Sequence, residues 1–406
     1  MRNATHSLFT GLMLTCACAL YLLCSGCFAS GTAPSSQPDD ATDPVTGLDV
    51  VPIAGEPDGV CGDIGTNVCY VTCPLKDTSG NVQGGAIEIV DLTTATLTKS
   101  ISTVTESPYP PRSPALNPVT KKLYVALGDS IGVCDVSMNT LKTKIKLPQQ
   151  YETASALCVD STANRVYAAC STVGASPTVA ILDGASDTLI KEVKVAQAGQ
   201  FIRVNPVTHR IFVGAQDYTA SDSTPCQVYE LAGDTGEVIS NNAYAGIING
   251  IALCGTTTQL AISVSPTYSQ PGDLRVITPD KHAGRDATKG IKLPAGYTVI
   301  GLPFTTTTNG ISANLYVDAK DASAQKHLLV FNVSDFSLIK DYKINTPGAS
   351  GAGSPASIAL GWVGWNKEVR AGVTTASDGR LIGLPQSSLG STANVNYVDD
   401  VKFVTQ

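Results

Sequence analysis

The residue types that most often carry catalysis are few in this chain of 406 residues, and they are scattered. Histidine is the usual general base and a common metal ligand. It occurs four times, and His209, His282 and His327 are the three outside the N-terminal segment. These three lie far apart, and none has neighbouring acids at metal-ligand spacing. The sequence therefore predicts no metal site and no histidine-dependent hydrolase.

A serine motif and a series of acids suggest two further chemistries. Residues 128–132 read GDSIG and match the G-x-S-x-G turn of serine hydrolases, but that turn must join a strand to a helix. In this chain the GDSIG segment lies between two expected strands, so a hairpin is predicted there. The acids occupy one position of a repeat, which favours a role in turns over a paired-carboxylate site; they are Asp91, Asp135, Asp183 and Glu230. No catalytic residue is predicted.

Eight of the 12 cysteines lie beyond the first 27 residues, and an even number in an exported protein suggests disulfides. The candidates are Cys61, Cys69, Cys73, Cys134, Cys158, Cys170, Cys226 and Cys254. A four-residue turn at 161–164 would place Cys170 opposite residue 155, too far from Cys158 for a bridge, so at least one other pairing scheme is expected. Neither a haem-attachment motif nor a phosphate-binding glycine loop occurs, and no cofactor is predicted.

The elements that must position all these residues are short strands in a repeat. Three stretches align without gaps, NPVTKKLYV at 117–125, DSTANRVYA at 160–168 and NPVTHRIFV at 205–213, and each is a turn followed by an apolar strand. A second signature of strand, acid or Asn, and hydroxyl follows each one. Markers of the second strand recur every 43–55 residues, at Tyr70, Tyr124, Tyr167, Phe212, Ile262, Tyr316 and Ala371. Seven such units predict an all-β fold, a seven-bladed β-propeller of four-stranded antiparallel blades.

These NPVT segments resemble the YVTN-type repeats of bacterial and archaeal surface-layer and periplasmic seven-bladed propellers. The resemblance covers most of residues 59–400 and is strongest over 115–236. It implies the fold, and it implies no chemistry because that family is defined by its blade signatures.

The N-terminal segment has the features of a targeting signal. Residues 8–24 are uncharged and mostly apolar, long enough for a signal peptide and short for a membrane span. They lead into Ser25-Gly26-Cys27, which resembles the bacterial lipobox, and the resemblance implies that Cys27 is lipidated. The expected domains are a signal peptide at 1–26, a tether at 27–47 and the propeller at 48–406. We expect a cell-envelope protein anchored to a bacterial membrane and facing the periplasm or the exterior; the alternative is cleavage after Ala29 and secretion.

The repeat also separates two faces. The turns between strands 1 and 2 and between strands 3 and 4 are alike from blade to blade, and we call their side the turn face. The 2–3 loops and the 4–1 connections differ in length and composition, and we call their side the variable face; varied loops on a rigid scaffold usually carry binding. The candidate binding residues are Tyr109, Arg112, Tyr151, Tyr218 and Tyr268 in such loops, and Arg203 in the central funnel. Cys61, Cys158 and Cys254 are expected at the first-strand position that Arg203 occupies in blade four.

Composition and the lack of a catalytic constellation together favour one function over another. Charged residues make up only 15% of the chain and the net charge is −7, which argues against disorder and against nucleic acid as a partner. We expect a non-catalytic binding or scaffold protein that recognises a protein, peptide or glycan, with the membrane contacted only through the lipid anchor. The alternative is a propeller-type enzyme, a lactonase, lyase or quinone-dependent dehydrogenase, with its site in the central funnel.

Overall fold

Strands and tight turns make up the computed structural model, and no helix occurs among the residues it describes. These residues belong to one compact unit, Thr42–Gln406. They comprise the strands at 355–362, 369–375, 381–383 and 402–404 and residues 59–344 apart from 64–65, 67, 78, 80, 92–95, 148–151, 173–175, 217–223, 255–258, 267–271, 280–288, 300–303 and 309–310.

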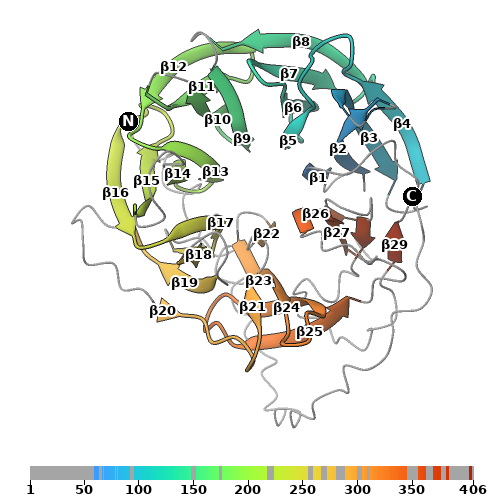
Figure 1. Ribbon diagram of the computed structural model, residues 1–406. Coiled ribbons are helices and arrows are strands. Elements are labelled where there is room, and N and C mark those ends of the chain that lie inside the picture. The colour runs from blue at the N-terminus through green and yellow to red at the C-terminus, as the bar shows by residue number, and fades with distance from the viewer. Residues whose placement is uncertain are drawn as a thin grey trace, which may run out of the picture. The chain divides into compact units, whose positions relative to one another are not determined.

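Seven antiparallel sheets follow one another along the chain (Figure 1). In the first three sheets, four consecutive strands pair in sequence order. Blade one is β1 (Gly59–Asp63), β2 (Val68–Lys76), β3 (Val82–Asp91) and β4 (Thr96–Ser102). Blade two is β5 (Arg112–Asn117), β6 (Lys122–Ala126), β7 (Ser130–Asp135) and β8 (Thr140–Lys146). Blade three is β9 (Glu152–Asp160), β10 (Arg165–Thr172), β11 (Thr178–Asp183) and β12 (Thr188–Lys194).

The remaining sheets keep this plan with one addition. Blade four is β13 (Ala198–Asn205), β14 (Arg210–Gln216), β15 (Cys226–Ala232) and β16 (Val238–Tyr244). Blade five is β17 (Ile247–Leu253), β18 (Leu260–Ser265), β19 (Asp273–Ile277) and β20 (Lys289–Gly290). Blade six is β22 (Phe304–Thr308), β23 (Ile311–Lys320), β24 (Lys326–Asn332) and β25 (Leu338–Ile344), with the short β21 (Thr298–Val299) also paired to β23. Blade seven is β26 (Pro355–Trp362), β27 (Val369–Thr375), β28 (Leu381–Gly383) and β29 (Lys402–Val404).

The first strands of neighbouring blades contact one another, which arranges the sheets radially. This series of contacts runs from β26 through β1, β5, β9, β13 and β17 to β22 (Figure 1). The fold is therefore the predicted seven-bladed β-propeller, and all seven markers of the second strand lie on second strands.

The apolar core lies between blades. Tyr124, Tyr167 and Phe212, which the repeat places at equivalent second-strand positions, are fully buried. Tyr124 packs in a cluster drawn from blades two and three, and Tyr167 in a cluster from blades three and four. Neighbouring blades thus bury each other's faces, so each boundary between blades is a structural unit of its own.

The turn between strands 1 and 2 is built the same way in blades two, three and four. The side-chain oxygens of Asn117, Asp160 and Asn205 each accept two backbone N–H groups from the turn that follows, at 2.9–3.2 Å. The fourth turn residue is left-handed in each case, at Lys121, Asn164 and His209. The GDSIG segment is likewise a hairpin, since Leu127 N donates to Ser130 O between β6 and β7. The predicted 1–2 turns and the predicted hairpin at 128–132 are both confirmed.

One repeated acid is out of place. Arg165 pairs with Asp183 across β10 and β11, whereas the equivalent Arg210 pairs with Ala232 across β14 and β15. Glu230 therefore lies two residues before the position that Asp183 occupies in blade three, and the prediction that it shares that position was wrong. The acids that do share the position cap their turns as predicted; Asp135 and Asp183, for example, accept N–H groups two and three residues ahead.

Ring closure also differs from the sequence-based expectation. The apolar segments at 48–53 and 401–405 predict that a strand from one terminus completes a blade begun by the other. Instead β29 pairs with β28 as the outer strand of its own blade, and β1 opens a sheet made of β1 to β4. The first and seventh blades meet through contacts of β1 with β26 and β27. Residues 1–58, with Cys27 and the segment at 48–53, lie outside the described residues.

Candidate functional site

The boundary between blades two and three is held on the turn face by a lysine. Lys122 opens β6 in blade two, and its Nζ lies 2.8 Å from the Asp187 carboxylate and 2.8 Å from Gly184 O, both in the 3–4 turn of blade three. The Tyr124 hydroxyl lies 3.1 Å from the same carboxylate. Both partners of the ion pair are largely buried, with side chains 18% and 14% exposed. We call this arrangement the closed clasp.

A second contact joins the 1–2 turns of neighbouring blades. Asn117 Nδ2 of blade two donates to Asn164 Oδ1 of blade three at 2.8 Å. At the next boundary the equivalent pair is Asp160 and His209, with Nδ1 2.6 Å from Oδ2. The Asp160 carboxylate is fully buried, so an acid and a histidine replace two amides in one repeated geometry.

The boundary between blades three and four lacks the closed clasp. Gly236 takes the left-handed turn position of Asp187, so blade four has no carboxylate at that position. A Cβ at Gly236 would lie 2.6 Å from Val193 Cγ2, and this crowding explains the glycine. Arg165, the counterpart of Lys122, instead bonds Asp183 of its own blade at 2.7 Å. The Tyr167 hydroxyl still reaches across, to Gly233 O at 3.2 Å.

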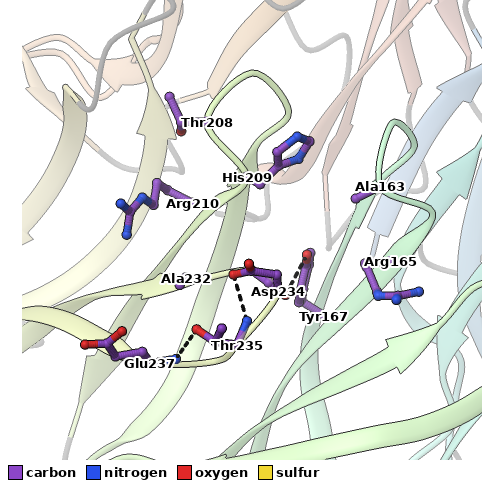
Figure 2. Close-up of a pocket in the computed structure, with 11 residues that line it drawn as sticks. Ala163, Arg165, Tyr167, Thr208, His209, Arg210, Ala232, Asp234, Thr235 and Glu237 are labelled. Carbon is purple, nitrogen blue, oxygen red and sulfur yellow. Dashed lines mark hydrogen bonds between the residues drawn. The ribbon is translucent and has the colours of Figure 1, made fainter.

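The absent clasp leaves a hollow of about 560 Å³ on the turn face. Figure 2 shows Ala163 and Arg165 on one side of it, His209 and Arg210 on the other, and the 3–4 turn of blade four with Asp234 and Thr235 along a third side. Two arginines, a histidine and two acids, Asp234 and Glu237, give it polar walls. The sequence predicts binding on the opposite face, and this hollow was not predicted; Gly236, where Asp187 stands in blade three, is the sequence difference that marks it.

The protonation states around these boundaries follow from burial and from neighbouring carboxylates. Burial and the Asp187 carboxylate raise the pKa of the Tyr124 hydroxyl, and burial and Asp160 raise the pKa of Tyr167. Both hydroxyls therefore keep their protons and can donate. The backbone N–H groups of Ser186 and Ala185 lower the pKa of Asp183, so this carboxylate stays charged beside Arg165.

On the variable face, the connection from β4 to β5 holds an aromatic ring in a fixed place. The Tyr109 ring lies directly over the left-handed Gly128, where a Cβ would overlap it, and the tyrosine is still 49% exposed. Ser107 Oγ accepts the N–H of Tyr109 at 3.0 Å and donates to Leu127 O at 3.2 Å. Arg112 is exposed at the start of β5. The structure thus brings two of the predicted binding residues to one connection.

Among the inner strands, Arg203 lies beside a cysteine. It pairs with Phe212 as Cys158 pairs with Tyr167, so these residues hold equivalent positions, as predicted, and Cys61 opposite Tyr70 is a third. Burial lowers the pKa of the Arg203 guanidinium, and Cys158 is close enough to influence it. In blade five the equivalent residue is Ile251, and Cys254 follows β17, so the prediction for Cys254 was wrong.

No disulfide joins the eight described cysteines, which are all thiols, so the predicted bridges are not supported. In blade three Cys158 faces Tyr167 as predicted, but a bulge shifts Cys170 opposite Ala154 and not residue 155. Four residues of strand, about 13 Å, then separate the two positions. Burial raises the pKa of Cys134 to about 12 and of Cys226 to about 11, which keeps these thiols protonated and unreactive at neutral pH.

A polar cluster in blade six was also missed. His327 is 4% exposed, and its Nδ1 lies 2.7 Å from Asp341 while its Nε2 lies 3.5 Å from Asp321. The Tyr297 hydroxyl donates to Asp341 at 2.8 Å, and its ring meets His327 edge-on. His209 and His327 therefore both have acidic neighbours in space, which the sequence spacing did not indicate. The acids come from another blade or another strand, which sequence spacing does not reveal.

The other candidates lie outside the described residues: Tyr151, Tyr218, Tyr268, His282 and Cys27. Within the described ranges, no three His, Cys, Asp or Glu side chains gather in a way that could hold a metal ion. Nor does the described part of the chain contain a helix with the length and apolar character needed to cross a membrane.

Comparison with known proteins supports the fold. No protein-family model matches the chain, and no curated protein matches its sequence. Among solved structures, hydrazine synthase from Kuenenia stuttgartiensis superposes with a TM-score of 0.58 at 12% identity, over 90% of this chain and 99% of that one. The Cps50 (Swd1) β-propeller domain of Myceliophteria thermophila superposes with a TM-score of 0.52 at 11% identity, over 81% and 95% of the two chains. Likenesses at this identity show the propeller fold alone.

Proposed function

We propose that this propeller is a binding or scaffold protein of the cell envelope, anchored through a lipid on Cys27 and recognising a partner protein with its variable face. The fold supplies a rigid frame, and the boundaries between blades two, three and four fix its geometry. Peptide and glycan ligands would use the same face.

The arrangement around Tyr109 is the observation that carries this proposal. An exposed aromatic ring on a flexible loop loses conformational entropy on binding, whereas a ring already held against Gly128 loses little. Tyr109 offers a large apolar area with a hydroxyl, and Arg112 adds a charge a few residues away; these are the residue types enriched at interface hot spots. Val104, in the same connection, is also 43% exposed.

Replacing Tyr109 and Arg112 together by serine is expected to weaken capture of the partner by about 30-fold or more, as loss of one hot spot of about 2 kcal/mol would. Capture is measured by pull-down from envelope extracts, quantified for the band that the wild-type protein retains. The double variant should still unfold in one cooperative transition, because Tyr109 is 49% exposed and Arg112 is exposed.

The matched control lies on the turn face. Val119 and Val207 are 73% and 56% exposed in NPVT turns, and their replacement by serine should leave capture unchanged. Capture that survives the Tyr109 and Arg112 changes but fails in the Val119 and Val207 variant would place the partner on the turn face and refute the proposal.

The anchor has its own test. Cells fed a fatty-acid analogue should label the wild-type protein, and Cys27→Ala should abolish the label, because the acyl chains that give stable anchoring are attached at this cysteine. An unlabelled wild-type product released from the cell would instead support the secreted alternative.

A further inference from the structure

We propose that the hollow between blades three and four is a binding site for a carboxylate group, separate from the variable face. The closed clasp supplies the precedent within the same molecule. At the boundary of blades two and three, a carboxylate sits between the amino group of Lys122 and the hydroxyl of Tyr124. One boundary further on, Arg165 and Tyr167 hold the equivalent positions, with Arg165 bonded to Asp183 and Tyr167 to Gly233 O, and Gly236 has no side chain where Asp187 supplies the acid.

Two arginines of the hollow, Arg165 and Arg210, have N–H groups available for a further hydrogen-bond acceptor. Arg165 contacts Asp183 through Nη1, in a pair whose side chains are 33% and 26% exposed, so other N–H groups of its planar guanidinium remain for a second oxygen acceptor. Arg210 Nε lies 4.0 Å from Glu230, beyond hydrogen-bond distance, and the Arg210 side chain is 36% exposed. Both arginines line the hollow. A guanidinium binds a carboxylate through two parallel hydrogen bonds, which suits a ligand entering from solvent.

Two acids that line the hollow, Asp234 and Glu237, restrict which carboxylate ligands can bind. Asp234 lies on the blade-four turn, where its carboxylate accepts the N–H of Thr235 at 2.8 Å, and Glu237 follows it. They repel a multiply charged anion more strongly than a single carboxylate, and they can accept hydrogen bonds from donor groups beside that carboxylate. An aspartyl or glutamyl side chain within a peptide fits this pattern, and so does a uronic acid; both present one carboxylate with N–H or O–H donors nearby.

The test compares ligands that differ only in the carboxylate. The purified full chain is titrated with acetyl-Gly-Asp-Gly-amide and acetyl-Gly-Asn-Gly-amide, and with glucuronate and glucose, by ligand-observed saturation-transfer NMR. At least one carboxylate probe should bind about tenfold or more tightly than its neutral counterpart, the size of effect expected for a charged hydrogen-bonded pair. The peptide and sugar arms identify the source of the carboxylate.

The variants assign that binding to the hollow. Arg165→Gln should remove the preference for the carboxylate, whereas Lys144→Gln on the variable face should preserve it. Because the Arg165 pair is partly exposed, Arg165→Gln should keep the wild-type melting temperature. Equal binding of charged and neutral probes by the wild type, or an unchanged preference in a folded Arg165→Gln protein, would overturn the proposal.

A complementary variant tests the same chemistry without any unknown ligand. Asp187 is left-handed, so Asp187→Gly should open the closed clasp without backbone strain. Sodium acetate should then recover part of the lost melting temperature, and sodium chloride at equal ionic strength should not. Failure of acetate to act on this variant would count against the clasp as a carboxylate site. Neither result bears on Tyr109, which lies on the opposite face, so this proposal and the proposed function fail separately.

Discussion

Replacing Asp160 by alanine is expected to lower the free energy of unfolding by about 3 kcal/mol, since three hydrogen bonds to one buried carboxylate are lost at about 1 kcal/mol each. Two of the donors are the N–H groups of Thr162 and Ala163 in the tight 1–2 turn, and the third is His209 from the next blade. The substitution therefore loosens a turn and a blade boundary at once. Equilibrium unfolding in urea measures the change.

The repeat suggests asparagine as the matched control substitution, because Asn117 and Asn205 accept the equivalent turn N–H groups in the adjacent blades. Asp160→Asn keeps an oxygen for the two turn N–H groups and should lose about 1 kcal/mol, mainly at His209. An equal loss in the alanine and asparagine variants would show that the turn bonds contribute nothing. A negligible loss in both would contradict the role assigned to the buried acid.

Two cations at one repeated position should differ sharply in their effect on stability. Lys122→Met strands the largely buried Asp187 carboxylate and removes the donor to Gly184 O, so a loss of about 3 kcal/mol is expected. Arg165→Met breaks a partly exposed pair within one blade and should lose less than about 1 kcal/mol. Sequence alignment alone would give the two substitutions the same effect.

Parallel urea titrations of the two methionine variants decide this comparison. Lys144→Met is the reference for an exposed ion pair, since Lys144 lies 3.1 Å from Glu106 with both side chains more than a third exposed. Similar losses for Lys122→Met and Arg165→Met would mean that the closed clasp contributes no more than a surface ion pair.

The fold was predictable because its signals are local. A turn whose first side chain caps its own backbone, followed by an alternating strand with Tyr124, Tyr167 or Phe212 at its centre, fixes both the strand pairing and the spacing of blades. The register of single residues was less predictable. A bulge shifted Cys170 by one position, and an alignment by hydroxyls placed Glu230 two residues from its structural equivalent.

The sites were harder to predict because they depend on differences between blades and on contacts between distant residues. The hollow exists because Gly236 has no side chain and because Arg165 turns toward its own blade. Asp160 and His209 meet across a boundary, 49 residues apart, and Asp341 reaches His327 from the next strand. Neither pair follows a sequence motif. The exposure of Tyr109 and Arg112 was predictable because they lie in a proline-rich connection of varied composition, and their role in binding stays a prediction.

The self-contained blades have a consequence for how such a gene can change. Because no described blade borrows a strand from the opposite end of the chain, the coding sequence can begin at a different blade without splitting any sheet. It can also gain or lose the codons of one whole blade. Each such rearrangement leaves the hydrogen bonds within the sheets intact. Selection then acts on the boundaries between blades, where pairs such as Lys122 with Asp187 and Asp160 with His209 would be separated and replaced by other contacts.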